Sequence, residues 1–364
     1  MTTPRSPRRQ RERAEESMAS IAHFLLRDPE GIQRILMMRD YASRAATLPA
    51  RDRAGLDVAV IESFLPPMPG SAPPRRHPAP AEEVQEVDVF ILTVQPIELQ
   101  ATLAALGIDG GPDAVRRDRP YYHKKLACTA AGLAVPPAEL TVAVTAIGEA
   151  YGLYAQHAVD EITTFYRANV WILAGMAAGL PGHTRKGDVH LPKTVWWYEP
   201  GRLTVDRFEP RPEVASRGPM NLQLMRFDPT GAKLHDRLAS AIAELPGRHR
   251  PADLPADFEP RVSVLSDAVA SGDKLLRDGT HLLTLHESNQ RIVLGDQESY
   301  GFAFACRDVD WMIARGVADF GDQEKDSSYQ YLATLLAVHT VLEFLESIYI
   351  PPGFAIPGRL DDQP

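Results

Sequence analysis

The sequence has little cysteine, no excess of basic residues and no long apolar run. Cys128 and Cys306 are the only cysteines among 364 residues, too few for a disulfide framework, which favours a reducing, cytoplasmic location. The formal net charge of −9 argues against a general nucleic-acid binder, whose domain normally presents a basic face. No apolar stretch approaches the roughly 20 residues that cross a membrane. The N-terminus also lacks the apolar region of a secretory signal.

Motifs for common cofactors are missing as well. The chain has neither a Walker loop nor a Gly-x-Gly-x-x-Gly fingerprint. His183 with His190, and His281 with His286, lack the spacing and the convergent acid of a metal site. We therefore expect no metal and no cofactor.

Composition divides the chain into four parts. Residues 1–65 begin with an arginine-rich tail and continue as short amphipathic helical patterns, and residues 66–84 are rich in proline, which favours an extended linker. Residues 85–350 form the main domain and residues 351–364 a C-terminal tail. Short amphipathic helices must bury their apolar stripes on the main domain, on each other or on another chain, so the N-terminal helices are a candidate site for a regulatory partner.

Strand and helix patterns alternate through the main domain, which predicts an α/β sandwich around a parallel or mixed sheet. Ligands of such sheets bind at the carboxyl ends of strands. The predicted elements are strand 87–94, helix 98–106, strand 140–146, helix 154–166, strand 170–174 followed by a glycine-containing turn, a strand that ends at Asp319 and helix 329–345.

Asp319 stands where an apolar run meets an acidic loop. The segment Arg315-Gly-Val-Ala-Asp319-Phe-Gly-Asp322, followed by the helical pattern, resembles the catalytic turn of the purine nucleoside phosphorylase and nucleosidase superfamily. The matching aspartate of that family protonates the departing purine base. The family usually has a serine before this aspartate, where the present chain has Ala318, so another group must orient Asp319.

The resemblance also implies a fold and an assembly. The family's fold is a three-layer α/β/α sandwich with a twisted mixed central sheet, here joined to a small helical N-terminal region. Members commonly form dimers or higher homo-oligomers and bind a small purine nucleoside or nucleotide.

Glu298 is the candidate ribose ligand. The segment Leu294-Gly-Asp-Gln297-Glu298-Ser-Tyr-Gly301 resembles the family's Met-Glu segment, whose glutamate accepts hydrogen bonds from both ribose hydroxyls. A carboxylate suits a cis-diol because it accepts two hydrogen bonds, which strengthen as positive charge develops on the sugar. Gln297 replaces the methionine that lies under the ribose, so the contact with the sugar or with its 5′ substituent is expected to differ.

Glu98 is the candidate for activating water. It follows the first predicted strand in Thr93-Val-Gln95-Pro96-Ile-Glu98, where hydrolytic members of the family carry a glutamate. Phosphorolytic members instead bind phosphate through arginines near this strand and near the later glycine turn. Neither segment of this chain supplies an arginine, which favours water over phosphate as the nucleophile.

Two further segments resemble the substrate loops of the family. Ala174-Gly175-Met176-Ala177-Ala178-Gly179 is the first, in which glycine would let the backbone approach a sugar or a base. Ser271-Gly-Asp-Lys-Leu275-Leu276 is the second, after which a side chain packs on the purine. Leu275 occupies a position that is often phenylalanine in adenine-specific members.

The resemblance therefore implies a purine nucleosidase that releases the base of an adenine-type nucleoside or nucleotide. The segment from Arg315 to Asp326 looks closer to nucleosidase domains that act as effectors in microbial immunity than to housekeeping methylthioadenosine enzymes, which implies nucleotide depletion as the output. Two alternatives remain open: a phosphate-dependent purine nucleoside phosphorylase, and an inactive sensor that binds a nucleoside without cleaving it.

Overall fold

Helices and strands alternate along the part of the chain that a computed structural model describes, residues 84–129, 139–203, 208–216, 218–274, 280–322 and 327–351. The predicted N-terminal region and nearly all of the linker and of the C-terminal tail lie outside the described residues, so those domain boundaries stay predictions. None of the helices in the described ranges is long and apolar enough to cross a membrane.

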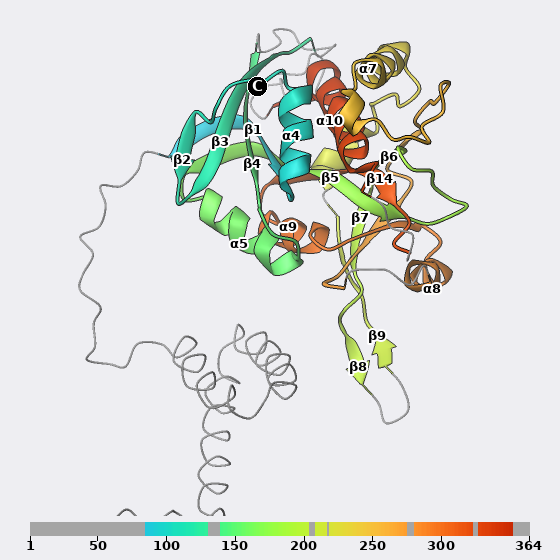
Figure 1. Cartoon of the computed structure of the whole chain (residues 1–364). Coiled ribbons are helices and arrows are strands. Elements are labelled where there is room, and N and C mark those ends of the chain that lie inside the picture. The colour runs from blue at the N-terminus through green and yellow to red at the C-terminus, as the bar shows by residue number, and fades with distance from the viewer. Residues whose placement is uncertain are drawn as a thin grey trace, which may run out of the picture. The chain divides into compact units, whose positions relative to one another are not determined.

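The described elements are numbered as in Figure 1. The helices are α4 (Pro96–Ala105), α5 (Gly152–Ile162), α6 (Gly218–Leu224), α7 (Ala232–Ala243), the 3-10 helix η1 (Gly247–His249), α8 (His281–Ser288), α9 (Ser299–Ala305) and α10 (Gln330–Ser347). The strands are β1 (Gln85–Thr93), β2 (Ala114–Arg116), β3 (Arg119–Ala127), β4 (Glu139–Ala146), β5 (Tyr166–Gly179), β6 (Val189–Leu191), β7 (Thr194–Trp197), β8 (Gly201–Leu203), β9 (Phe208–Pro210), β10 (Glu213–Ala215), β11 (Val262–Val264), β12 (Ala268–Ser271), β13 (Ile292–Asp296) and β14 (Asp310–Asp319).

A mixed 12-stranded sheet forms the centre of the domain, and β8 pairs with β9 in a separate ribbon. Strand β1 lies between β4 and β5 and runs parallel to both, whereas β3 is antiparallel to β4. Strand β14 runs parallel to β5 along most of its length. The continuous apolar run of β1 is explained by this central place, because a strand covered on both faces buries all its side chains.

Helices cover both faces of the sheet. On one face α4, α7 and α10 pack over alternate strand residues such as Val89 and Ile91. On the other face α5, α8 and α9 pack over the intervening residues, among them Phe90 and Leu92. Figure 1 shows α5 and α9 together on one side and α4 with α10 on the other. This arrangement confirms the predicted α/β sandwich with a mixed sheet.

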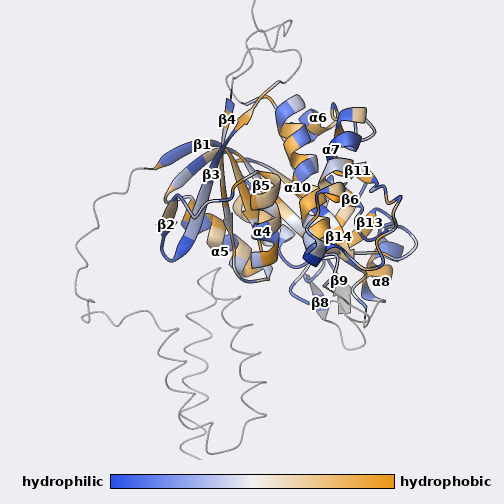
Figure 2. Ribbon diagram, turned by 45° about the horizontal axis from the view of Figure 1, so that its top comes forward, coloured by the Kyte–Doolittle hydropathy of each residue, from blue (hydrophilic) through white to orange (hydrophobic). Residues whose placement is uncertain are grey.

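The two longest helices among the described residues differ in how they are buried. Helix α10 is apolar around most of its circumference, and most of its side chains are buried. Helix α7 buries Leu234, Leu238 and Ile242 and exposes its remaining face, which is the spacing of an amphipathic surface helix. Figure 2 shows α7 in both blue and orange along its length.

Two predicted boundaries are wrong. Strand β5 continues to Gly179, whereas the sequence predicted a turn after Ala174. Helix α5 ends at Ile162, and Tyr166, predicted as its last residue, is the first residue of β5. In β5 the hydrogen-bonded register with β14 passes through Gly175, so this glycine lies in a strand and does not break it.

Candidate active site

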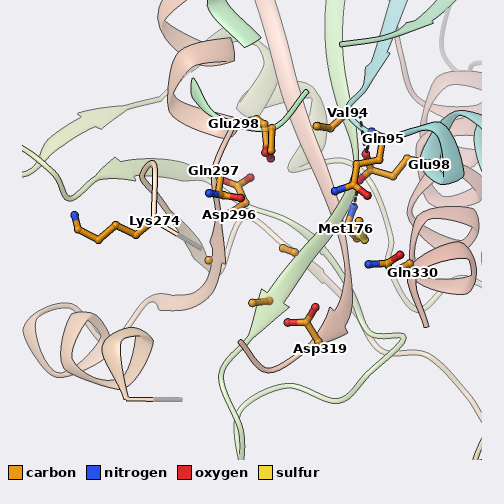
Figure 3. A pocket seen from close by; sticks show the side chains of 14 residues that line it. Val94, Gln95, Glu98, Met176, Lys274, Asp296, Gln297, Glu298, Asp319 and Gln330 are labelled. Carbon is orange, nitrogen blue, oxygen red and sulfur yellow. Dashed lines mark hydrogen bonds between the residues drawn. The ribbon is translucent and has the colours of Figure 1, made fainter. Parts of the chain in front are cut away.

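A cavity of about 260 Å³ opens where several strands end. Gln95 follows β1, Ala150 follows β4, and Asp296 and Asp319 are the last residues of β13 and β14. This is the position at which α/β sheets bind ligands. Figure 3 shows the lining residues, which are Val94, Gln95, Glu98, Ala150, Met176, Ala177, Ala178, Lys274, Gly295, Asp296, Gln297, Glu298, Asp319 and Gln330.

Glu98 lies at the start of α4 and is almost fully buried. Its Oε2 accepts the backbone N–H groups of Val94 (2.8 Å) and Gln95 (2.7 Å), and its Oε1 accepts that of Met176 in β5 (2.8 Å). Burial raises the pKa of Glu98, and Arg315 and the three N–H donors only partly oppose this effect. A fixed carboxyl group with a raised pKa is suited to accept a proton.

Arg315 connects the carboxylates beneath the cavity. It lies in the middle of β14 and its side chain is fully buried. Its Nε and Nη2 lie 2.9 and 2.6 Å from Asp296 Oδ2, and its Nη2 lies 3.5 Å from Glu298 Oε2. Its Nη1 is buried without a hydrogen-bond partner among the described residues. We call Arg315, Asp296, Glu298 and Glu98 the Arg315 cluster.

Gly175 makes room for this cluster. A Cβ atom added to Gly175 would overlap Glu98 Oε1 and would lie 2.9 Å from Arg315 Nη1. The sequence predicted that a glycine here lets the backbone approach the substrate. The structure instead fills this space with the two charged side chains, so any larger residue would separate them.

Glu298 stands at the N-terminus of α9 and lines the cavity. Its Oε1 accepts the backbone N–H of Tyr151 at 3.3 Å. Tyr151 has φ 93° and ψ 146°, a backbone conformation that favours glycine, so this donor is held at a cost in strain. Burial, followed by the negative charge of Asp296, raises the pKa of Glu298 to about 8, although Arg315 opposes the shift.

Asp319 ends β14 on another wall of the same cavity and is 4% exposed. Its Oδ1 accepts the backbone N–H of Gly321 at 2.8 Å, an interaction within its own turn that orients the carboxyl group. The structure thus brings Asp319, Glu298 and Glu98 to one cavity, although Glu98 precedes Asp319 by 221 residues in the sequence.

The predicted substrate-binding residues divide into three groups. Gln297 lines the cavity, and its Nε2 donates to Asp273 O at 3.2 Å. Ala174, Gly175 and Ser271 do not line it: Ala174 is buried in β5, and Ser271 Oγ accepts the backbone N–H of Tyr300 in α9. Met176, Ala177 and Ala178 form that wall instead. Leu275 and Leu276 lie outside the described residues, so their role stays a prediction.

Sequence reasoning did not assign a role to Arg315, Asp296, Gln95 or Gln330. A signal for Arg315 was present, because an arginine within an apolar strand is rarely buried unless it is paired. Its partners cannot be read from the sequence, since Asp296 precedes it by 19 residues. The arginine is covered by Asp296 and Glu298, so it differs from the exposed arginines that a phosphate dianion needs.

The histidines take part in other contacts. His190 is buried in β6, where its Nδ1 lies 2.7 Å from Asp267 Oδ2. The rings of His183 and His286 lie 4.4 Å apart. Within the described residues no group of three or more His, Cys, Asp or Glu side chains is arranged to hold a metal ion.

Comparison with solved structures identifies the fold. The 5′-methylthioadenosine/S-adenosylhomocysteine nucleosidase of Neisseria meningitidis matches 71% of this chain and 98% of its own, with TM-score 0.50 and 14% identity. The S-adenosylhomocysteine nucleosidase of Streptococcus pyogenes matches 73% and 99%, with TM-score 0.51 and 12% identity. No family model matches the sequence. The described part of the chain therefore shares the fold of these nucleosidases.

The sequence is also similar to curated proteins. The ATP nucleosidase Cap17 of Escherichia coli is 26% identical over 271 residues, which are 72% of this chain and 52% of the relative. An uncharacterized protein of Sinorhizobium fredii, y4jS, is 27% identical over 195 residues, 49% of this chain and 44% of its own. The chain thus spans about half the length of the curated relatives it matches.

Proposed function

We propose that this protein hydrolyses the N-glycosidic bond of an adenine nucleoside or nucleotide, with ATP as a candidate substrate. The observation that carries the proposal is the convergence of Glu98, Glu298 and Asp319 on one cavity. The similarity to a relative named ATP nucleosidase supports the choice of adenine and of a nucleotide.

Each carboxyl group has one part in the proposed reaction. The bond between the anomeric carbon and the base nitrogen breaks, its electron pair leaves with the base, and Asp319 donates the proton that neutralises the base. Glu298 accepts hydrogen bonds from the 2′ and 3′ hydroxyls, which stabilises the positive charge that develops on the ribose. Glu98 takes a proton from the water that attacks the anomeric carbon. The products are free base and the sugar with its 5′ substituent.

The Arg315 cluster prepares Glu98 and Glu298 for these parts. Arg315 holds Asp296 and approaches Glu298, while Gly175 leaves space for Glu98 next to the guanidinium. The carboxylates therefore keep their positions before substrate binds, and little reorganisation is needed during the reaction.

The test is chromatographic detection of free base in phosphate-free buffer. Purified full-length protein is incubated with ATP, AMP, adenosine, methylthioadenosine, guanosine and inosine. We expect adenine release without phosphate, and a fall of at least about 100-fold in Asp319→Asn, because the amide cannot donate the acidic proton. Asp322→Asn is the matched control, since Asp322 lies in the same turn but does not line the cavity.

Other outcomes would select the alternatives. Release that requires phosphate would identify a phosphorylase, and tight binding of an intact nucleoside without release would identify a sensor. Hydrolysis in water enriched in oxygen-18 provides a second check, because a nucleosidase places the heavy oxygen on the anomeric carbon of the sugar.

The biological setting is part of the proposal. Hydrolysis of a nucleotide such as ATP would deplete a cytoplasmic pool, consistent with an effector in microbial defence. We infer a homo-oligomer, and a regulatory partner that binds through residues 1–65. Light scattering of the full chain tests the first inference. Base release after deletion of residues 1–65, compared with the full chain, tests the second.

A further inference from the structure

We propose that Gln95 and Gln330 form the subsite for the 5′ substituent and select a phosphate over an apolar thioether. Their side chains come from two elements, Gln95 from the corner before α4 and Gln330 from the first residue of α10. Both line the cavity, and in Figure 3 both carboxamides point into it from the same side. The inference rests on the proposed nucleosidase reaction.

The positions of Asp319 and Glu298 leave this wall for the 5′ carbon. A ribose ring sends its base, its 2′,3′ diol and its 5′ carbon in three different directions. If Asp319 meets the base and Glu298 meets the diol, the 5′ carbon points to the part of the lining that neither acid occupies. Figure 3 shows Gln95 and Gln330 across the cavity from Gln297 and Lys274.

The backbone holds Gln95 at the corner that precedes α4. Gln95 precedes Pro96, and its backbone is extended (φ −100°, ψ 158°), as expected before proline. Its N–H donates to Glu98 Oε2 at 2.7 Å, which anchors it beside the proposed water-activating group. Helices α4 and α10 belong to the same apolar core, in which Ala101 and Leu336 are fully buried. Gln95 and Gln330 therefore lie at the starts of two helices that share one core.

The chemistry of carboxamides suits a phosphate at this place. Each amide carries two N–H donors and no net charge, so it binds phosphate oxygens without forming an ion pair with the nearby Glu98. Both side chains are partly exposed, so a phosphate chain that leaves the cavity here keeps part of its hydration. A thioether would cover these amides without accepting their hydrogen bonds, which is unfavourable.

Lys274 offers the competing position for a phosphate. It also lines the cavity, but its Nζ pairs with Glu199 and lies 5.4 Å from the centre of the Tyr198 ring. The ammonium is thus engaged on the wall opposite the two amides. The proposal assigns the phosphate to the neutral amides and not to this lysine.

The experiment compares substrates in three variants. The ratio of kcat/KM for AMP or ATP to that for methylthioadenosine is measured for Gln95→Met, Gln330→Met and the control Lys274→Met. Methionine has a similar length and is apolar. We expect each glutamine variant to lower the ratio roughly tenfold, the loss of about one hydrogen bond to a charged group, and Lys274→Met to leave the ratio unchanged.

A wild-type preference for methylthioadenosine, an unchanged ratio in both glutamine variants, or a loss confined to Lys274→Met would overturn the proposal. Calorimetric binding of AMP and methylthioadenosine to Asp319→Asn, with and without the glutamine substitutions, makes the same comparison without turnover. If no variant releases base, the proposed reaction fails, while the binding preference still decides the 5′ subsite.

Discussion

Two buried groups of charges in this domain have opposite compositions. In the Arg315 cluster one guanidinium pairs with Asp296 and Glu298 and also interacts electrostatically with Glu98. Asp188 lies between β5 and β6, and its one carboxylate forms ion pairs with Arg185 and Arg261. We call this group the Asp188 anchor. The Asp188 side chain is 2% exposed, whereas its two arginines are 52% and 56% exposed.

The pKa values of the buried carboxyl groups follow this difference in composition. At the anchor the donors overcome the cost of burial, and hydrogen bonds from Arg261 and the backbone lower the pKa of Asp188. In the Arg315 cluster carboxylates outnumber the cation, and the pKa values of Glu98 and Glu298 are raised. An excess of donors stabilises a fold, whereas an excess of buried carboxylates is costly and is typical of a functional site.

Removing Arg315 should have the largest effect. In Arg315→Met, Asp296 and Glu298 lose their buried cation, so we expect the free energy of unfolding to fall by about 3 to 5 kcal/mol. Base release should fall by about 100-fold or more, because Glu98 and Glu298 lose their fixed positions. Urea unfolding and base release measure the two effects.

Arg315→Lys separates charge from geometry. Lysine keeps the positive charge but lacks the planar fork that reaches both Asp296 and Glu298. We expect stability closer to wild type and activity still reduced. If Arg315→Met kept wild-type stability and activity, the proposed difference between the Arg315 cluster and the Asp188 anchor would be wrong.

Weakening the anchor should affect stability alone. In Asp188→Asn we expect a loss of about 2 kcal/mol, because an amide oxygen accepts fewer hydrogen bonds from Arg185 and Arg261. The folded pKa of Asp188 is depressed, so its contribution is present above the unfolded pKa of about 3.9 and is lost as pH falls through the folded pKa. Urea unfolding at several pH values should show the difference from wild type shrinking at acid pH. A large drop in kcat for this variant would show that the anchor also serves the site.

The sequence predicted the regular parts of the fold because they depend on local patterns. Strand β1 and helices α4 and α10 follow from apolar runs and helical spacing that neighbouring residues determine. Strand β5 was predicted too short because Gly175 is a turn signal in isolation. Position 175 requires glycine because the side chains of Glu98 and Arg315 approach it in the folded domain.

The candidate site was predicted only in part, because local sequence patterns do not reveal contacts that the fold creates. Asp319, Glu298 and Glu98 were found through resemblance to a family; Asp319 ends a predicted strand and Glu98 follows another, whereas no strand was predicted before Glu298. Arg315 was seen only as a residue of a strand, because its meaning depends on side chains brought together by the fold. The excess of carboxylates over cations in the Arg315 cluster is therefore apparent only from the folded structure.

The smallest effect concerns the pH dependence of the Arg315 cluster, and it tests the contrast most directly. The pKa of Glu298 is raised to about 8, so the folded protein binds a proton that the unfolded chain releases near pH 4.5. Stability from this group is full below the unfolded pKa and is lost as pH rises through the folded pKa. Activity should change in the opposite direction, because in the proposed reaction the carboxylate form of Glu298 accepts the hydrogen bonds of both ribose hydroxyls.

We therefore expect kcat/KM to rise towards pH 8 while the free energy of unfolding falls over the same range. Asp296→Asn removes the negative charge that contributes to the shift, so the rising limb should move to lower pH by about one unit. Glu98 also has a raised pKa and lies near the same arginine, so the limb reports the cluster and not one residue. A flat profile between pH 6 and 9, or a limb that moves to higher pH in Asp296→Asn, would show that the excess of carboxylates does not control protonation here.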